Sequence, residues 1–128
     1  MDPSAQMLNH IKNSQAAQKP SVVLSFSNLK YNLLKILEEC QFVEKVEKKG
    51  RGSKRTLEIL LKYTEGQPAV SGFKKVSKSS QRVYIPAQKI KPIKGGQGLT
   101  IISTPQGLMT GKEARKKNLG GEVICEVW

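Results

Sequence analysis

Residues 95–128 constrain the fold more than any other part of the chain. Their order predicts a strand at Leu99–Ser103, a turn, a short basic helix and a closing strand at Glu122–Trp128. The turn is Thr104-Pro105-Gln106-Gly107, which fits type I because proline stands second and glycine fourth. This segment therefore predicts a mostly antiparallel β unit that carries one short helix.

The short helix has a sequence signal at each end. Thr110 and Glu113 have the spacing of a capping box, so the helix is expected to begin beside them. Basic residues follow, which suits the negative end of the helix dipole. Gly120 and Gly121 are expected to end the helix.

The whole chain predicts an α+β protein of two small lobes, residues 1–64 and 65–128. The first lobe is expected to contain a helix from Pro3 to about Ala17, a strand at Ser21–Phe26, a helix capped by Ser27, and strands at Phe42–Glu47 and Thr56–Tyr63. The turn residues Thr64–Pro68 mark the boundary. The β-rich second lobe adds strands at Ala69–Val76 and Arg82–Ile85, a turn or 3₁₀ piece within Pro86–Lys94, and an irregular entry at Gly95, Gly96 and Gly98.

Charge points to a polyanionic partner. The chain of 128 residues has 22 Lys and Arg against 10 Asp and Glu, a formal net charge of +12. No acidic residue occurs from Gly66 to Lys112, although a surface that is merely solvated usually mixes both signs. Nucleic acid is the first candidate partner and an anionic membrane the second.

Catalysis, metal binding and cofactor binding find little support. His10 is the only histidine, and Cys40 and Cys125 form no CxxC pair, so a transition-metal site is not expected and both thiols are expected to be buried. Gly107–Lys112 (GLMTGK) lacks the spacing of a phosphate loop, and Glu113 stands where that loop needs Ser or Thr. The chain start is no signal peptide and no apolar run could span a membrane, so a soluble cytoplasmic protein without a small-molecule substrate is expected.

Several residues of the second lobe could read a nucleic acid. The lysines and Arg82 can neutralise phosphates, whereas the hydroxyls of Ser103 and Thr104 can hydrogen-bond to sugars or bases. Tyr84 is the aromatic candidate for stacking, with a core role as the alternative. Glu122 could orient a basic side chain, accept a base amino group, or be an ordinary surface acid. A nonspecific nucleic-acid chaperone and a nuclease remain alternatives to a specific binder.

The chain resembles the bacterial-type ribosomal protein S8 family essentially from end to end. The similarity is most specific from Gly98 to Trp128, where the strand, the STxxG turn, the MTxxEAR helix and the GGE strand follow the family order. The resemblance implies a two-lobe protein without catalytic activity that binds a stem in the central domain of small-subunit ribosomal RNA. It further implies an early role in subunit assembly and contacts with neighbouring small-subunit ribosomal proteins.

The resemblance also assigns residues. It implies that the turn at 103–107 enters the RNA groove, with Pro105 where a serine is common and Gln106 where a lysine is common. Lys30, at the start of the second expected helix, matches a basic position of the family. The full set of predicted RNA-binding residues is Lys30, Arg82, Tyr84, Ser103, Thr104, Pro105, Gln106, Gly107 and Glu122.

Overall fold

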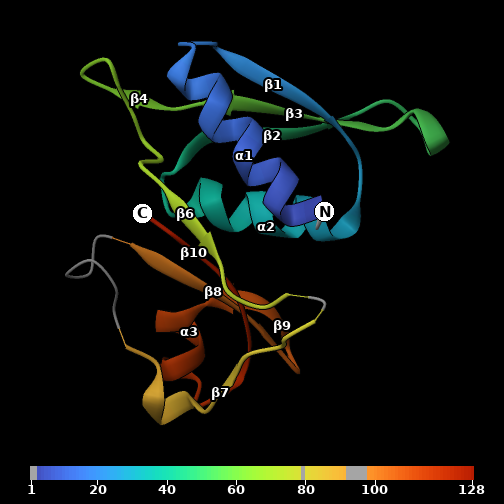
Figure 1. Ribbon diagram of the computed structural model, residues 1–128. Helices are drawn as coiled ribbons and strands as arrows, with labels where there is room; N and C mark the ends of the chain where they lie inside the picture. Colours follow the sequence, from blue (N-terminus) through green and yellow to red (C-terminus); the bar gives the residue numbers. More distant parts are fainter. Residues whose placement is uncertain (1–2, 79, 92–97) are drawn as a thin grey trace. The chain divides into compact units, whose positions relative to one another are not determined.

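The computed structural model describes residues 3–78, 80–91 and 98–128. It divides into two compact units, Met1–Ser71 and Gly72–Trp128. Helices and antiparallel sheets occur together, which confirms the α+β class. Figure 1 shows the helices and strands of both units.

The first unit is built on a three-stranded antiparallel sheet in the order β1-β3-β2. Its strands are β1 (Ser21–Ser25), β2 (Val43–Lys49) and β3 (Thr56–Leu61). In β3 every second residue is buried, because successive side chains point to opposite faces of a sheet. A short 3₁₀ turn, η1 (Gly52–Lys54), lies in the loop between β2 and β3.

Two helices cover the buried face of this sheet. Helix α1 (Pro3–Ala16) packs against β1, and α2 (Asn28–Glu39) packs against β2 (Figure 1). Ser27 caps α2 as predicted, accepting a hydrogen bond from the backbone N–H of Lys30 at 3.1 Å. The fully buried side chains of this core come from both helices and from the sheet: Met7, Ile11, Leu33, Leu34, Leu37, Val43, Leu57 and Ile59.

The segment predicted as the lobe boundary folds into a small hairpin. Strands β4 (Tyr63–Thr64) and β5 (Gln67–Pro68) pair there, and Glu65 and Gly66 have φ values of 52° and 79° at the tip. The turn residues were identified correctly, but they reverse the chain locally instead of linking two units. The division between the units falls seven residues beyond Thr64, after Ser71.

The second unit contains a five-stranded antiparallel sheet. The strands are β6 (Phe73–Lys75), β7 (Tyr84–Ile85), β8 (Leu99–Thr104), β9 (Gly107–Thr110) and β10 (Gly121–Val127). Their order is β6-β10-β8-β9. Strand β7 pairs with the start of β10, and β6 pairs with the end of β10 on the same side. The strand expected at Ala69–Val76 is limited to β6, and the strand at Arg82–Ile85 to β7.

Helix α3 (Gly111–Lys116) packs on β8 and β9 over a small apolar core. The core consists of Ile90, Ile102, Met109 and Ala114, with Ile85 and Leu119 packed at its margin. The predicted 3₁₀ piece is η2 (Ala87–Lys89), next to α3. The irregular entry predicted at Gly95 and Gly96 lies outside the described residues.

One strand of the second unit was missed and one helix end was misplaced. Strand β9 was not predicted, because its four residues begin with glycine and run directly into α3. The glycine stop was also misplaced: Asn118, with φ 56°, ends α3, and the N–H of Leu119 donates to Ala114 O at 2.8 Å. This is a Schellman motif with asparagine in the left-handed position. Thr110 does cap α3, accepting from the Glu113 N–H at 3.1 Å.

Candidate nucleic-acid interface

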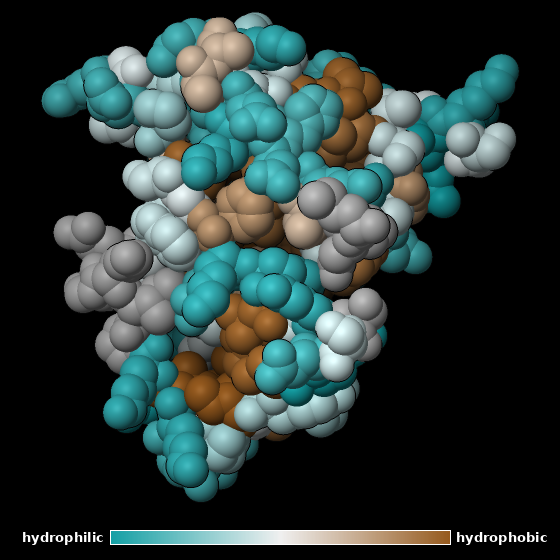
Figure 2. Space-filling view, in the orientation of Figure 1, coloured by the Kyte–Doolittle hydropathy of each residue, from teal (hydrophilic) through white to brown (hydrophobic). Residues whose placement is uncertain are grey.

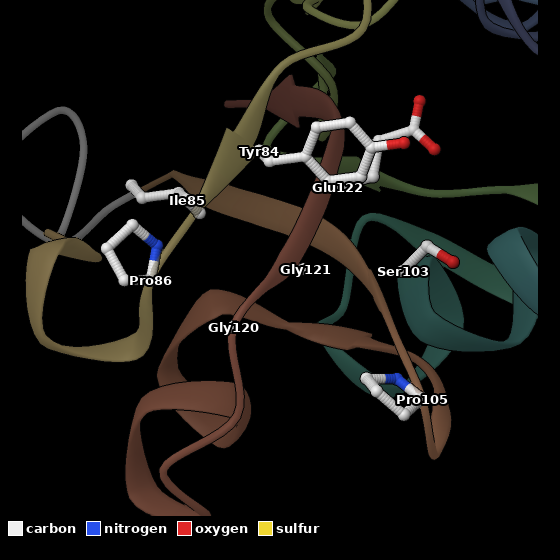
Figure 3. Close-up of a pocket in the computed structure, with 8 residues that line it drawn as sticks. All are labelled: Tyr84, Ile85, Pro86, Ser103, Pro105, Gly120, Gly121 and Glu122. Atoms are coloured by element: carbon white, nitrogen blue, oxygen red, sulfur yellow. The ribbon is translucent and has the colours of Figure 1, made fainter.

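Tyr84, Glu122 and Ser103 form a row across three strands of the second unit. Glu122 of β10 is the register partner of Tyr84 on β7 and of Ser103 on β8. Register partners in antiparallel strands point to the same face of the sheet. An aromatic ring, a carboxylate and a hydroxyl from distant parts of the sequence are therefore neighbours on one surface (Figure 3).

The row differs in exposure along its length. Tyr84 is 70% exposed, which decides against the alternative of a core residue. Ser103 is half-buried, and its hydroxyl makes no hydrogen bond to the residues that the structure describes. The row thus presents the exposed ring of Tyr84 and the Ser103 hydroxyl, which can still donate and accept hydrogen bonds.

Glu122 forms an ion pair with Arg82. The Arg82 Nη1 donates to Glu122 Oε2 at 3.0 Å, and the two side chains are 57% and 16% exposed. Because Arg82 is the more exposed partner, the pair extends the row toward solvent. The carboxylate holds one edge of a guanidinium that has five N–H donors in a fixed plane.

The turn between β8 and β9 is held by the Thr104 side chain. Its Oγ1 accepts the Gln106 N–H at 3.1 Å and donates to the Gly107 carbonyl oxygen at 2.9 Å. Thr104 is buried, whereas Pro105, Gln106 and Gly107 are exposed. The Thr104 hydroxyl therefore shapes the turn internally, and the two residues between the strands are presented to solvent.

Gly120 and Gly121 allow three backbone segments to come together beside this row. A Cβ on Gly120 would lie 2.6 Å from the Ile85 carbonyl oxygen, and a Cβ on Gly121 would overlap the Ser103 carbonyl oxygen. Neither position can accept a side chain without moving backbone. These glycines, predicted to end a helix, instead permit the close approach of β7, β10 and β8.

An open depression of about 570 Å³ lies along the row. Figure 3 shows its lining residues: Tyr84, Ile85, Pro86, Ser103, Pro105, Gly120, Gly121 and Glu122. Ile85, Pro86 and the two glycines were not predicted as site residues. Their proximity depends on the β7–β10 register, which no local sequence pattern specifies.

Ser77 is another residue that the sequence did not single out. It is buried, and its Oγ accepts the Val83 N–H at 2.9 Å while its own N–H donates to Val123 O at 3.2 Å. These bonds fix the segment that leads into β7, and with it Arg82 and Tyr84. In the sequence Ser77 belongs to a polar stretch, SKSSQ, that resembles an ordinary loop.

The structure brings together seven of the nine predicted residues in the depression or in the turn beside it: Tyr84, Ser103, Thr104, Pro105, Gln106, Gly107 and Glu122. Arg82 joins them through its ion pair with Glu122. Lys30 lies in the first unit, where its Nζ donates to Ser25 O and Ser25 Oγ at 3.3 and 3.2 Å. Within the described ranges, no group of His, Cys, Asp and Glu could hold a metal ion, and no helix is long and apolar enough to cross a membrane.

Fold and site together define a small, strongly basic α+β protein that presents hydroxyl, carboxylate and aromatic groups on an exposed sheet surface. The family model for ribosomal protein S8 matches residues 2–128. The chain belongs to the ribosomal protein S8 family, as the sequence resemblance indicated. This is a structural family without enzymatic activity.

Curated relatives support the same assignment over the full length. A small ribosomal subunit protein uS8 from Kosmotoga olearia is 43% identical over 131 residues, covering 99% of this chain and 98% of the relative. The protein of the same name from Cupriavidus metallidurans is 44% identical over 126 residues, covering 98% and 96%. That from Solibacter usitatus is 38% identical over 128 residues, covering 99% and 98%.

Proposed function

We propose that this chain is a structural component of the small ribosomal subunit, located in the cytoplasm, which binds one stem of the central domain of small-subunit ribosomal RNA and supports subunit assembly. Neighbouring small-subunit ribosomal proteins are its further partners. The observation that carries the proposal is the row of Tyr84, Glu122 and Ser103 beside an exposed turn, in a family member with a net charge of +12.

The row offers the groups that RNA recognition requires. Stem RNA has a wide, shallow minor groove that displays 2′-hydroxyls, and its bulged or splayed bases can stack on aromatic rings. The Ser103 hydroxyl can donate to or accept from a 2′-hydroxyl, and the exposed ring of Tyr84 can stack on a base or pack against a ribose. Specific reading is assigned to these groups because phosphate contacts carry no sequence information.

The ion pair gives Arg82 and Glu122 complementary roles. Glu122 holds the guanidinium at 3.0 Å, so Arg82 approaches the RNA backbone in a fixed orientation. The carboxylate is mostly buried and would repel phosphates if it were alone. Pairing with Arg82 offsets that repulsion, and the remaining acceptor capacity of Glu122 can face a base amino group.

The turn supplies the contact that enters the groove. Pro105 and Gln106 are the exposed tip, and the bonds of Thr104 hold them in one conformation. A turn ordered before binding loses less conformational entropy when the RNA docks. Thr104 therefore acts as a positioning residue, while Gln106 and the backbone of Gly107 make the contacts.

The test is binding of the purified chain to small-subunit ribosomal RNA at physiological salt, with excess unrelated RNA as competitor. We expect binding that survives competition and protects one stem. Ser103→Ala should weaken that complex by about fivefold, the equivalent of one net hydrogen bond of about 1 kcal/mol. Ser80→Ala, which changes an exposed serine of the same unit, is the matched control and should bind like the unaltered chain.

If the competitor RNA displaced the ribosomal RNA completely, the specific interaction would be refuted. That result would favour a nonspecific nucleic-acid chaperone, whose affinity comes from charge alone. Equal affinities of the Ser103→Ala and Ser80→Ala variants would refute the role of the row. A DNA version of the protected stem should bind more weakly than the RNA, because it lacks the 2′-hydroxyls.

A further inference from the structure

The loop between β2 and β3 in the first unit is strongly basic. Five of the eight residues from Lys48 to Arg55 are Lys or Arg, and none is acidic. Gly50 and Gly52 have φ values of 83° and 58°, and a Cβ on Gly50 would lie 2.6 Å from the Lys54 carbonyl oxygen. The loop therefore has a specific shape that depends on glycine. Figure 2 shows hydrophilic side chains extending from it at the right of the first unit.

Two cations at the base of this loop lie over aromatic rings. The Arg55 guanidinium carbon is 4.2 Å from the centre of the Phe26 ring, and Lys48 Nζ is 4.7 Å from the centre of the Tyr31 ring. The two rings are themselves neighbours, with centroids 6.3 Å apart. Lys48, Tyr31, Phe26 and Arg55 thus form a continuous surface, which we name the cation–aromatic cluster.

Two other lysines on this hairpin, Lys45 and Lys49, have carboxylate partners. Lys45 pairs with Glu47 at 3.0 Å, and Lys49 pairs with Glu58 at 2.9 Å. Among the residues that the structure describes, no carboxylate pairs with Lys48 or Arg55. A ring face attracts a cation without neutralising its charge or occupying its N–H donors, so these two side chains are held in place and still able to bind an anion.

The backbone keeps the cluster together. The N–H of Phe26 donates to Arg55 O at 3.2 Å, which fixes the end of β1 against the end of the loop. Lys48 is the register partner of the fully buried Leu57, so it lies on the sheet face that α2 covers. Lys49 is the partner of Thr56 and lies on the opposite face. The two neighbouring lysines therefore serve different surfaces.

We propose that the cation–aromatic cluster is a second RNA-binding surface, on the first unit, that binds backbone phosphates without reading sequence. The inference rests on the proposed function, since RNA is the polyanion that the row in the second unit would select. Arg55 suits a phosphate because its planar donor fork can make two parallel hydrogen bonds. Lys48 adds a point charge beside it.

The experiment uses the full chain with the double substitution Lys48→Gln and Arg55→Gln. Affinity is measured for the protected ribosomal stem and for unrelated RNA across a series of salt concentrations. We expect both affinities to fall by on the order of tenfold and the salt slope to decrease by between one and two units, because about two phosphate contacts are lost. The preference for the protected stem should remain unchanged.

The matched control is Lys45→Gln with Lys49→Gln, which removes the same charge from the same hairpin but on the opposite face. If this control variant lost as much affinity as the Lys48/Arg55 variant, a local contact would be refuted. The loss would then be explained by the reduced net positive charge alone. Unchanged affinity and slope in the Lys48/Arg55 variant would refute the inference as well. Failure of the proposed function is distinguishable, since the unaltered chain would then show no preference for any stem.

A third variant, Tyr31→Leu, tests the ring itself. It keeps an apolar side chain beside Lys48 but removes the aromatic face. We expect a severalfold loss of affinity with the salt slope retained, because both charges remain but one is less ordered. The urea unfolding midpoint of each variant is compared with that of the unaltered chain. Equal midpoints would show that the substitutions at these exposed or half-exposed positions leave the fold intact. If Tyr31→Leu bound RNA as the unaltered chain does, the ring would have no part in holding Lys48.

Discussion

Thr104→Val should loosen the turn at the tip of β8 and β9 while leaving the size of the side chain unchanged. The Thr104 hydroxyl makes two hydrogen bonds, to the Gln106 N–H at 3.1 Å and to Gly107 O at 2.9 Å. Each is worth about 0.5–1.5 kcal/mol net, giving roughly 1–3 kcal/mol for the pair. Since Gln106 and Gly107 are exposed, water can replace part of this, and we expect a loss of about 1 kcal/mol.

Trp128 makes this loss measurable in the unit that carries the turn. It is the only tryptophan, and its backbone exchanges two hydrogen bonds with Gly72, both of 3.0 Å, at the end of β10. Its fluorescence should therefore follow the unfolding of the second unit in urea. For a small unit with a denaturant slope of about 1–2 kcal/mol per molar urea, the midpoint should fall by about 0.5–1 M.

The same variant should affect RNA binding through the order of the turn. If the unbound turn samples other conformations, about 1 kcal/mol is spent on ordering it, which corresponds to about fivefold weaker binding of the protected stem. Thr104→Ser is the control, because it keeps the hydroxyl and should retain the affinity. A valine variant with the midpoint and affinity of the unaltered chain would show that these two bonds do not hold the turn.

Four further predictions concern other parts of the chain. Gly121→Ala should destabilise the second unit by about 3 kcal/mol or more, seen as a lost Trp128 transition, because its Cβ would overlap backbone. Asn118→Ala should lower the unfolding free energy in urea by about 1 kcal/mol, and Asn118→Gly should not, because position 118 is left-handed. The hydrogen bond from Lys35 lowers the pKa of Glu38, so the ionised carboxylate stabilises the fold, and this contribution should be lost as the pH falls through the lowered pKa. In the Glu38→Gln variant the urea midpoint should therefore decrease less steeply at acidic pH than in the unaltered chain. Gln106→Lys should strengthen RNA binding and raise the salt slope by about one unit, measured by titration at several salt concentrations.

Much of the fold could be predicted because local signals agreed with the final packing. The alternation in β3 and the Ser27 and Thr110 caps each depend on residues close in sequence. The ends of the helices were harder to predict, because α1, α2 and α3 are each followed by a Gln or Asn in the left-handed backbone conformation instead of by glycine. Strand β9 was missed because only its pairing with β8 defines it as a strand.

The candidate site was predictable by residue type but not by role. A hydroxyl-rich turn is visible in the sequence, whereas the burial of the Thr104 hydroxyl inside that turn depends on the β8–β9 register. The Arg82–Glu122 pair joins residues forty positions apart and requires β7 to pair with β10. Long-range registers of this kind are set by tertiary packing, which no short window of sequence contains.

Pro105 and Gln106, which the sequence resemblance places where a serine and a lysine are common, lie at the exposed tip of the turn. Both side chains are exposed, and the turn that carries them is held by the two hydrogen bonds of the Thr104 hydroxyl, which involve only backbone atoms of Gln106 and Gly107. Exchanging residues at the tip therefore alters the groups offered to RNA without altering their placement. Under the proposed function, a hydroxyl and a cation absent from the tip would leave the row of Tyr84, Glu122 and Ser103 unchanged.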